Sequence, residues 1–230
     1  MNRVRLRFSK LGKVRWTSHR DVARMWERAL RRAEIRVAYS EGFSPRPKLS
    51  FGLALSTGHE SLGEYLDVDL AAALDVAELP DRLTPGLPVG IDCLAGMELA
   101  GGEPSLQQDV TSCRWEMELD GLSDGAVADG VAAALAAPAL VITRTRKGTD
   151  VTDDVRPAIQ TMTASGALIV ADVATQPRGL RPGELLAACF PGVEAVRVLR
   201  THQWIERDGA RREPIPVDAT SLPHAMRACA

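Results

Sequence analysis

The chain has 230 residues, of which 45% are hydrophobic and 25% are charged, a composition typical of a soluble globular protein with one or two domains. Its first residues form no apolar run, and the longest apolar stretch, residues 131–142, is too short to span a bilayer and contains Pro138. These features argue against a secreted or membrane protein, and we predict a cytoplasmic one.

Basic residues are concentrated at the N-terminal end, although the formal net charge of the whole chain is only −2. Residues 1–50 contain fourteen Lys and Arg against four Asp and Glu, which leaves fourteen against twenty-six in residues 51–230. Such an asymmetry indicates a polyanion or an acidic partner at the N-terminal end.

The first fifty residues predict a strand followed by a helix. Val4, Leu6 and Phe8 alternate with arginines, which predicts a strand with one buried face and one solvent-exposed face of arginine. Residues 14–16 are expected to extend or pair with it. Ser18 is a predicted N-cap for a helix whose apolar stripe runs from Val22 to Ala33. Its other faces carry Arg20, Arg24, Arg28, Arg31 and Arg32.

The segment 40–52 combines fixed and permissive backbone positions, because two prolines lie between glycines at its two ends. It carries Phe43, Arg46 and Lys48 and directly follows Tyr39. This content suits the binding of an anionic or aromatic ligand. The alternative is a rigid connection into the strand that begins near Leu49.

The remaining elements predict an α+β fold made of two tandem ferredoxin-like domains with antiparallel sheets. Residues 49–55 and 65–69 form a predicted hairpin, 75–83 a helix and 90–99 a strand, giving the order of a first domain over residues 1–100. Residues 101–110 are a predicted linker. Residues 111–205 repeat the order, with strands at 113–119, 140–145, 155–159, 167–173 and 193–204 and helices at 124–136 and 182–190. Residues 206–230 are predicted to be a disordered tail.

Two further groups are candidates for function. Arg144, Arg146 and Lys147 form a second basic cluster that could extend a polyanion track, or could be an exposed hairpin tip. His19 lies next to the predicted cap and beside the basic surface, where it could transfer protons in the cleavage of RNA or could be an ordinary first-turn residue.

No pattern in the sequence indicates a metal or a cofactor. The four cysteines lie far apart and form no Cys-x-x-Cys pair, and we interpret them as reduced apolar residues. There is no phosphate-binding loop and no iron–sulfur spacing.

The ordered motifs of residues 3–70 resemble the radical-SAM-linked family, a bacterial domain of unknown function that occurs alone or joined to a radical SAM protein. The motifs are Arg5-x-Arg7-Phe8-Ser9-Lys10-x-Gly12, Ser18-His19-x-Asp21, Arg28 to Ala33, Tyr39 to Lys48, Gly58-x-x-Ser61 and Glu64 to Asp67, with weaker matches at residues 144–148 and 154–157. The resemblance implies a free-standing partner of a separately encoded radical SAM enzyme. It implies no established catalytic residues.

Together these observations lead to the hypothesis of an RNA-binding, substrate-presenting accessory protein for a radical SAM enzyme acting on tRNA or rRNA. The alternatives are a metal-independent ribonuclease using His19, and a protein-interaction module that docks the enzyme without touching RNA. The residues predicted to bind RNA are Arg5, Arg7, Arg20, Arg24, Arg28, Tyr39, Phe43, Arg46, Lys48, Arg144, Arg146 and Lys147.

Overall fold

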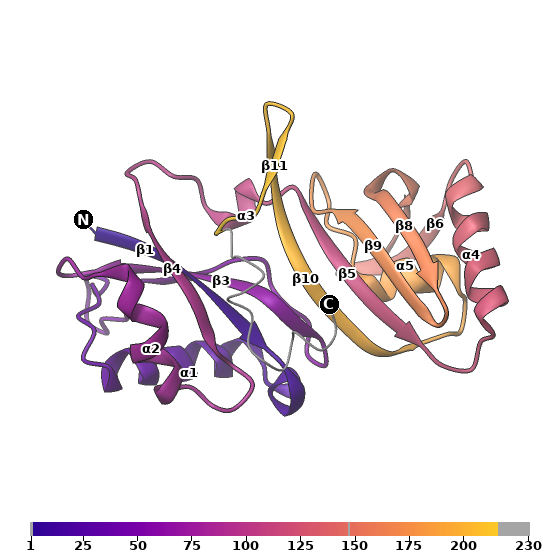
Figure 1. The fold of residues 1–230 in the computed structure, drawn as a ribbon. Coiled ribbons are helices and arrows are strands. Elements are labelled where there is room, and N and C mark those ends of the chain that lie inside the picture. Colours follow the sequence, from indigo (N-terminus) through magenta and orange to yellow (C-terminus); the bar gives the residue numbers. More distant parts are fainter. Residues whose placement is uncertain (1, 147, 216–230) are drawn as a thin grey trace. The chain divides into compact units, whose positions relative to one another are not determined.

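A computed structural model of the protein describes residues 2–146 and 148–215 and divides the chain into two compact units (Figure 1). Among these residues, unit 1 comprises 2–109 and 212–215, and unit 2 comprises 110–211. Each unit combines helices with an antiparallel sheet, which confirms the predicted α+β class.

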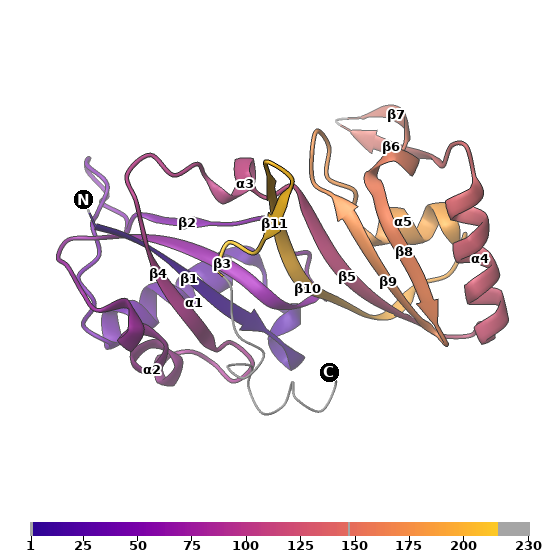
Figure 2. The ribbon, with the colours of Figure 1, turned by 45° about the horizontal axis from the view of Figure 1, so that its top comes forward.

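Unit 1 is built on four strands that lie in the order β2-β3-β1-β4, with every neighbouring pair antiparallel (Figure 2). The strands are β1 (Asn2–Lys10), β2 (Leu49–Phe51), β3 (Glu60–Leu70) and β4 (Cys93–Leu99). Helix α1 (His19–Arg32) and the short α2 (Leu79–Leu83) lie on one face of this sheet. The single-turn helices η2 (Val76–Glu78) and η3 (Thr84–Gly86) flank α2.

The core of unit 1 lies between β1, β3 and the two helices. Val4, Leu6 and Phe8 of β1 are buried toward α1, and the Phe8 ring meets the Trp26 ring edge-on with 5.0 Å between their centroids. Burial of a large apolar side chain contributes about 1.5–3 kcal/mol, so these contacts fix the helix on the sheet. The predicted apolar stripe of α1 is thereby confirmed.

Specific hydrogen bonds define both ends of α1. The Asp21 amide donates to the Ser18 hydroxyl at 3.2 Å, which confirms the predicted N-cap. At the other end, the amide of Ile35 donates to the carbonyl of Leu30 at 3.0 Å, while Glu34 adopts a left-handed φ of 54°. This is a Schellman termination with glutamate at the position that usually holds glycine.

Residues 14–16 do not form the predicted strand and instead belong to the 3₁₀ helix η1 (Gly12–Trp16). The buried Lys10 ammonium donates to the carbonyls of Arg15 and Thr17, at 3.3 and 3.1 Å. The Gly12 amide donates to the Glu60 carboxylate at 2.6 Å. The two bonds from Lys10 and the long-range bond to Glu60 hold the segment in a coil at the end of β1, which the alternation of residue types does not reveal.

Unit 2 has its main strands in the order β10-β5-β9-β8, again antiparallel. They are β5 (Ser112–Leu119), β8 (Ile159–Ser165), β9 (Leu168–Ala174) and β10 (Ala195–Arg207), accompanied by α4 (Asp124–Ala136) and α5 (Pro182–Cys189). The strand predicted at 140–145 exists as β6 (Val141–Arg146), but it pairs with β7 (Thr149–Asp154) in a separate hairpin. The prediction of a strand at 155–159 is wrong, because Arg156–Ala158 form the 3₁₀ helix η4.

The predicted linker and tail both contain ordered elements. Helix α3 (Leu106–Asp109) lies in the linker, and its Leu106 is buried in unit 1, within reach of Gly52. Residues 206–215 are not a disordered tail: they include the end of β10 and β11 (Ala210–Arg212), and Ile215 is buried. The rest of the predicted tail lies outside the described residues. Within the described ranges, no helix is long and apolar enough to cross a membrane.

Candidate nucleic-acid interface

The arginines of β1 do not form the solvent-exposed face that the alternation predicts. The Arg5 side chain is 2% exposed and makes two hydrogen bonds to the Asp67 carboxylate, at 2.7 and 3.0 Å. Arg5 and Asp67 are directly opposite in the β1–β3 register, so the sheet itself brings the charges together. Arg5 is therefore a buried ion-paired residue, and the prediction that it lines a phosphate track is wrong.

Arg7 is likewise buried, at 3% exposure. Its guanidinium donates to the Glu213 carboxylate at 2.7 Å and to the Ile215 carbonyl at 3.3 Å. Burial raises the pKa of Glu213, although the charge of Arg7 and its hydrogen bond act in the opposite direction. The prediction of an exposed, RNA-binding Arg7 fails because a segment more than two hundred residues away covers this face.

The arginines of α1, in contrast, are exposed. Arg20, Arg24, Arg28 and Arg31 follow one another at spacings of three or four residues and share one face of the helix, opposite the buried stripe. We call these four residues the arginine face. Arg24 is 3.6 Å from Asp21, both side chains being largely exposed, whereas Arg20, Arg28 and Arg31 have no carboxylate partner among the described residues.

The segment 40–48 follows this helix in the sequence and forms a loop whose ends are joined by hydrogen bonds. The Ser40 amide donates to the Arg46 carbonyl at 2.9 Å, and the Arg46 amide donates to the Ser40 hydroxyl at 3.0 Å. The tip carries Phe43, whose side chain is fully exposed, and Arg46 is exposed as well. Lys48 is half-buried, and its amide donates to the Ala38 carbonyl at 2.8 Å. The loop is therefore shaped by its own backbone, as the prolines and glycines predict.

A groove joins the end of α1 to the base of this loop. Its volume is about 420 Å³. Leu30, Ile35, Val37 and Pro47 supply apolar surface, and Arg31, Arg36 and the half-exposed Tyr39 supply charge and an aromatic ring, with Glu27 and Glu34 also in the lining. Sequence reasoning singled out Tyr39 but not Arg31, Arg36 or Pro47 as site residues. The signal available was an arginine and a tyrosine three residues apart, directly after the basic helix.

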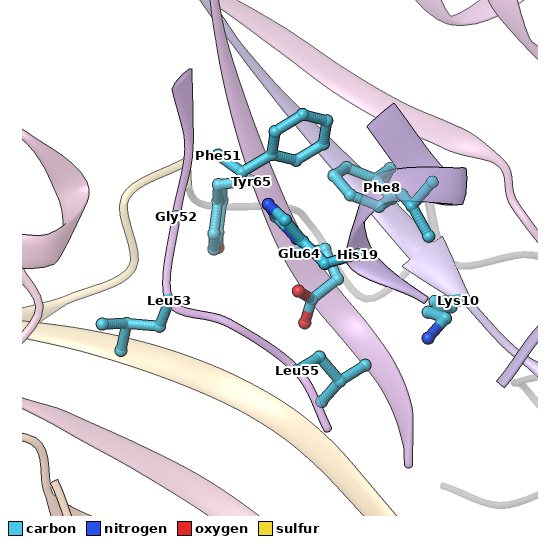
Figure 3. Close-up of a pocket in the computed structure, with 10 residues that line it drawn as sticks. Phe8, Lys10, His19, Phe51, Gly52, Leu53, Leu55, Glu64 and Tyr65 are labelled. Atoms are coloured by element: carbon cyan, nitrogen blue, oxygen red, sulfur yellow. The ribbon is translucent and has the colours of Figure 1, made fainter. Parts of the chain in front are cut away.

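His19 lies at the start of α1 and lines a second, smaller cavity together with Lys10, Glu64 and Tyr65 (Figure 3). The His19 ring meets the Phe51 ring edge-on at 4.9 Å. The cavity volume is only about 20 Å³, which holds roughly one water molecule. His19 itself is exposed, so a substrate phosphate would have to approach from outside rather than enter this cavity.

The second basic cluster is organised differently from its prediction. Arg144 is half-buried and pairs with Asp153 at 2.9 Å and with Glu184 at 3.4 Å, so acids within unit 2 already engage its guanidinium. Arg146 lies in β6, in the hairpin that the alternative interpretation anticipated, and Lys147 lies outside the described residues.

Sequence reasoning missed a charged and aromatic cluster in unit 2. The buried Asp172 carboxylate accepts hydrogen bonds from Arg114, at 3.0 and 2.8 Å, and from Arg211 at 3.2 Å. Burial alone would raise the pKa of Asp172, but these arginines lower it to about 2. Arg211 also lies over the Trp204 ring at 4.4 Å. The one available signal was an aspartate inside the apolar run 168–174.

Three described cysteines lie in separate elements, namely Cys93 in β4, Cys113 in β5 and Cys189 in α5. Burial raises the pKa of Cys93 to about 12 and that of Cys189 to about 11. At neutral pH these two thiols are therefore protonated and poorly nucleophilic, in line with an apolar packing role.

Comparison with known proteins identifies a family for the chain but gives no activity for that family. A search among curated proteins finds no match to the chain. A family model described as an uncharacterised protein conserved in bacteria (DUF2344) matches residues 3–182, which include the arginine face, the loop and the groove. Since the match covers most of the chain, the protein belongs to this family of uncharacterised bacterial proteins.

Proposed function

We propose that unit 1 binds single-stranded or looped RNA through the arginine face, the loop 40–48 and the groove between them. The observation that carries the proposal is that Arg20, Arg28 and Arg31 are exposed on one helix face without carboxylate partners among the described residues. Like charges at this spacing repel by about 0.2–0.5 kcal/mol per pair, and an anionic ligand removes that cost. The exposed rings of Tyr39 and Phe43 add surfaces on which bases can stack.

The larger role that we propose is that of an accessory protein which presents tRNA or rRNA to a separately encoded radical SAM enzyme. This part rests on the resemblance carried by the motifs of residues 3–70. We further propose that both units are ferredoxin-like, because the strand orders β2-β3-β1-β4 and β8-β9-β5-β10 are equivalent and each unit has a helix after its first and third main strands.

A salt-dependent titration tests RNA binding. About four phosphate contacts to single-stranded RNA give a slope of log affinity against log salt near −3, because each contact releases condensed counterions. Arg28→Ala and Arg46→Ala are each expected to reduce that slope by about 0.7. Arg181→Ala, which removes an exposed arginine of unit 2, is the matched control and is expected to leave the slope unchanged. Absent or salt-independent binding would favour the protein-docking module instead.

The second candidate function is the ribonuclease, favoured by the presence of Lys10 and Glu64 beside His19 in one cavity. The same titration samples, incubated with EDTA and analysed for RNA integrity, separate the two functions. Intact RNA supports the binding protein, whereas cleavage by the wild type that disappears in His19→Ala would establish the enzyme.

A further inference from the structure

We infer that the groove of unit 1 is a subsite for one unstacked base of single-stranded RNA, with Tyr39 as its stacking surface. The inference deepens the proposed function and rests on it. The groove volume of about 420 Å³ lies within the range of roughly 300–1,000 Å³ that is typical of small-molecule sites. It is therefore large enough for a base and its sugar, unlike the cavity beside His19.

The lining of the groove matches the parts of a nucleotide. Tyr39 is 51% exposed, so part of its surface is accessible to a ligand. Pro47 and Val37 provide apolar surface against which a base ring can pack. Arg31 and Arg36 are exposed and have no carboxylate partner among the described residues. They supply positive charge for the adjoining phosphates.

Backbone interactions hold residues 37–39 in place without help from a ligand. Tyr39 bridges to Pro47, Val37 bridges to Leu70, and the Ala38 amide donates to the Asp69 carbonyl at 2.7 Å. The segment 37–39 is thus tied both to the loop base and to β3. The backbone that carries the stacking residue therefore loses little conformational entropy on binding.

The two carboxylates in the lining indicate which bases fit. Glu27 and Glu34 would repel a phosphate placed between them, but they can accept hydrogen bonds from the amino group of a base. Glu34 holds a left-handed backbone conformation, with a φ of 54°, at the point where the helix ends beside the groove. We therefore expect cytosine, which carries an amino group, to bind better than uracil, which is the same size and has none.

The test measures the affinity of the full chain for oligo(C), oligo(U) and an abasic RNA of equal length. Tyr39→Ala should weaken binding to oligo(C) about 5- to 150-fold, the range found for loss of one base–aromatic stack, and should hardly change binding to the abasic strand. Tyr39→Phe keeps the ring and should retain wild-type affinity. Trp16→Ala removes an exposed aromatic residue outside the groove and is the matched control.

The preference for cytosine is tested with the double variant Glu27→Gln, Glu34→Gln. Removing two negative charges should strengthen binding to both RNAs, so the ratio of the two affinities is the informative quantity. We expect that ratio to fall in the double variant relative to the wild type. An unchanged ratio would overturn the role of the carboxylates.

The outcomes separate the subsite from the proposed function. If RNA binds with the expected salt slope but Tyr39→Ala affects oligo(C) and abasic RNA equally, the subsite is wrong and RNA binding stands. If no RNA binds, NMR titration with cytidine monophosphate decides the subsite alone. Shifts confined to groove residues would support it and their absence would overturn it, while the RNA-binding function fails in either case.

Discussion

The arginines of β1 and those of α1 lie within the same thirty-two residues, yet the fold treats them in opposite ways. Arg5 and Arg7 are almost fully buried, and each is held by a carboxylate at 2.7 Å. Arg20, Arg28 and Arg31 are exposed and have no such partner among the described residues. Residue type and local density of charge are therefore poor guides to availability. The deciding factor is whether a segment distant in the sequence packs beside the arginine and supplies an acid, as β3 does for Arg5 and residues 213–215 do for Arg7.

The largest expected effect comes from removing the acid of a buried pair. Asp67→Ala leaves the Arg5 guanidinium buried without its carboxylate and also removes a contact to Arg3, at 3.6 Å. We expect a loss of roughly 3–5 kcal/mol in the free energy of unfolding, measured by urea denaturation.

The matched control for that prediction replaces both partners. The double variant Arg5→Met, Asp67→Leu removes both charges and keeps apolar volume, so most of the lost stability should return. If Asp67→Ala alone were as stable as the wild type, water would have to reach the Arg5 guanidinium. The arginines of β1 and α1 would then differ less in their access to solvent than their burial indicates.

A smaller effect is expected for Asp172 of unit 2, whose arginine partners are partly exposed. Its pKa in the folded state is about 2, below the value of about 3.9 for an unfolded aspartate. The carboxylate therefore contributes stability that is fully present above about pH 4 and is lost as the pH falls toward 2. Asp172→Asn should lower stability by about 2–3 kcal/mol at pH 7.

The pH dependence of the difference between wild type and Asp172→Asn distinguishes this cause from a packing defect. Other carboxylates titrate over the same range in both proteins and cancel in the difference. The difference should shrink between pH 4 and pH 2 in paired thermal or urea unfolding experiments. A difference that is constant with pH would mean that the amide disturbs packing and that the ion pairs contribute little.

The smallest effect should have the opposite sign. Arg28 lies four residues from both Arg24 and Arg32 on α1, and all three are exposed. Arg28→Gln removes two like-charge repulsions at i±4 and should raise stability by about 0.4–1 kcal/mol at low ionic strength. Thermal unfolding at low and high salt checks this, because screening should abolish the gain. Destabilisation by this change would indicate that Arg28 has a structural role after all.

The sequence by itself determined the elements whose signals are local. The 3.6-residue apolar stripe and the Ser18 cap specify α1, and the alternation at residues 3–8 specifies β1, because helix and strand periodicities depend only on neighbouring residues. The loop 40–48 was also recognisable, since proline and glycine restrict or extend the backbone wherever they occur. The exposed parts of the candidate interface, the arginine face and the loop 40–48, follow from these elements.

Only the tertiary structure decided which charges are available. The alternation of Arg3, Arg5 and Arg7 is matched by Asp67 and Asp69, but the pairing depends on the β1–β3 register, which joins residues more than sixty positions apart. Arg7 is covered by Glu213 and Ile215, from a segment that composition alone suggested was a tail. The groove requires α1, residues 35–39 and Pro47 to meet in space. Such long-range packing leaves almost no trace in any local pattern, because it is set by the sum of many contacts across the sheet.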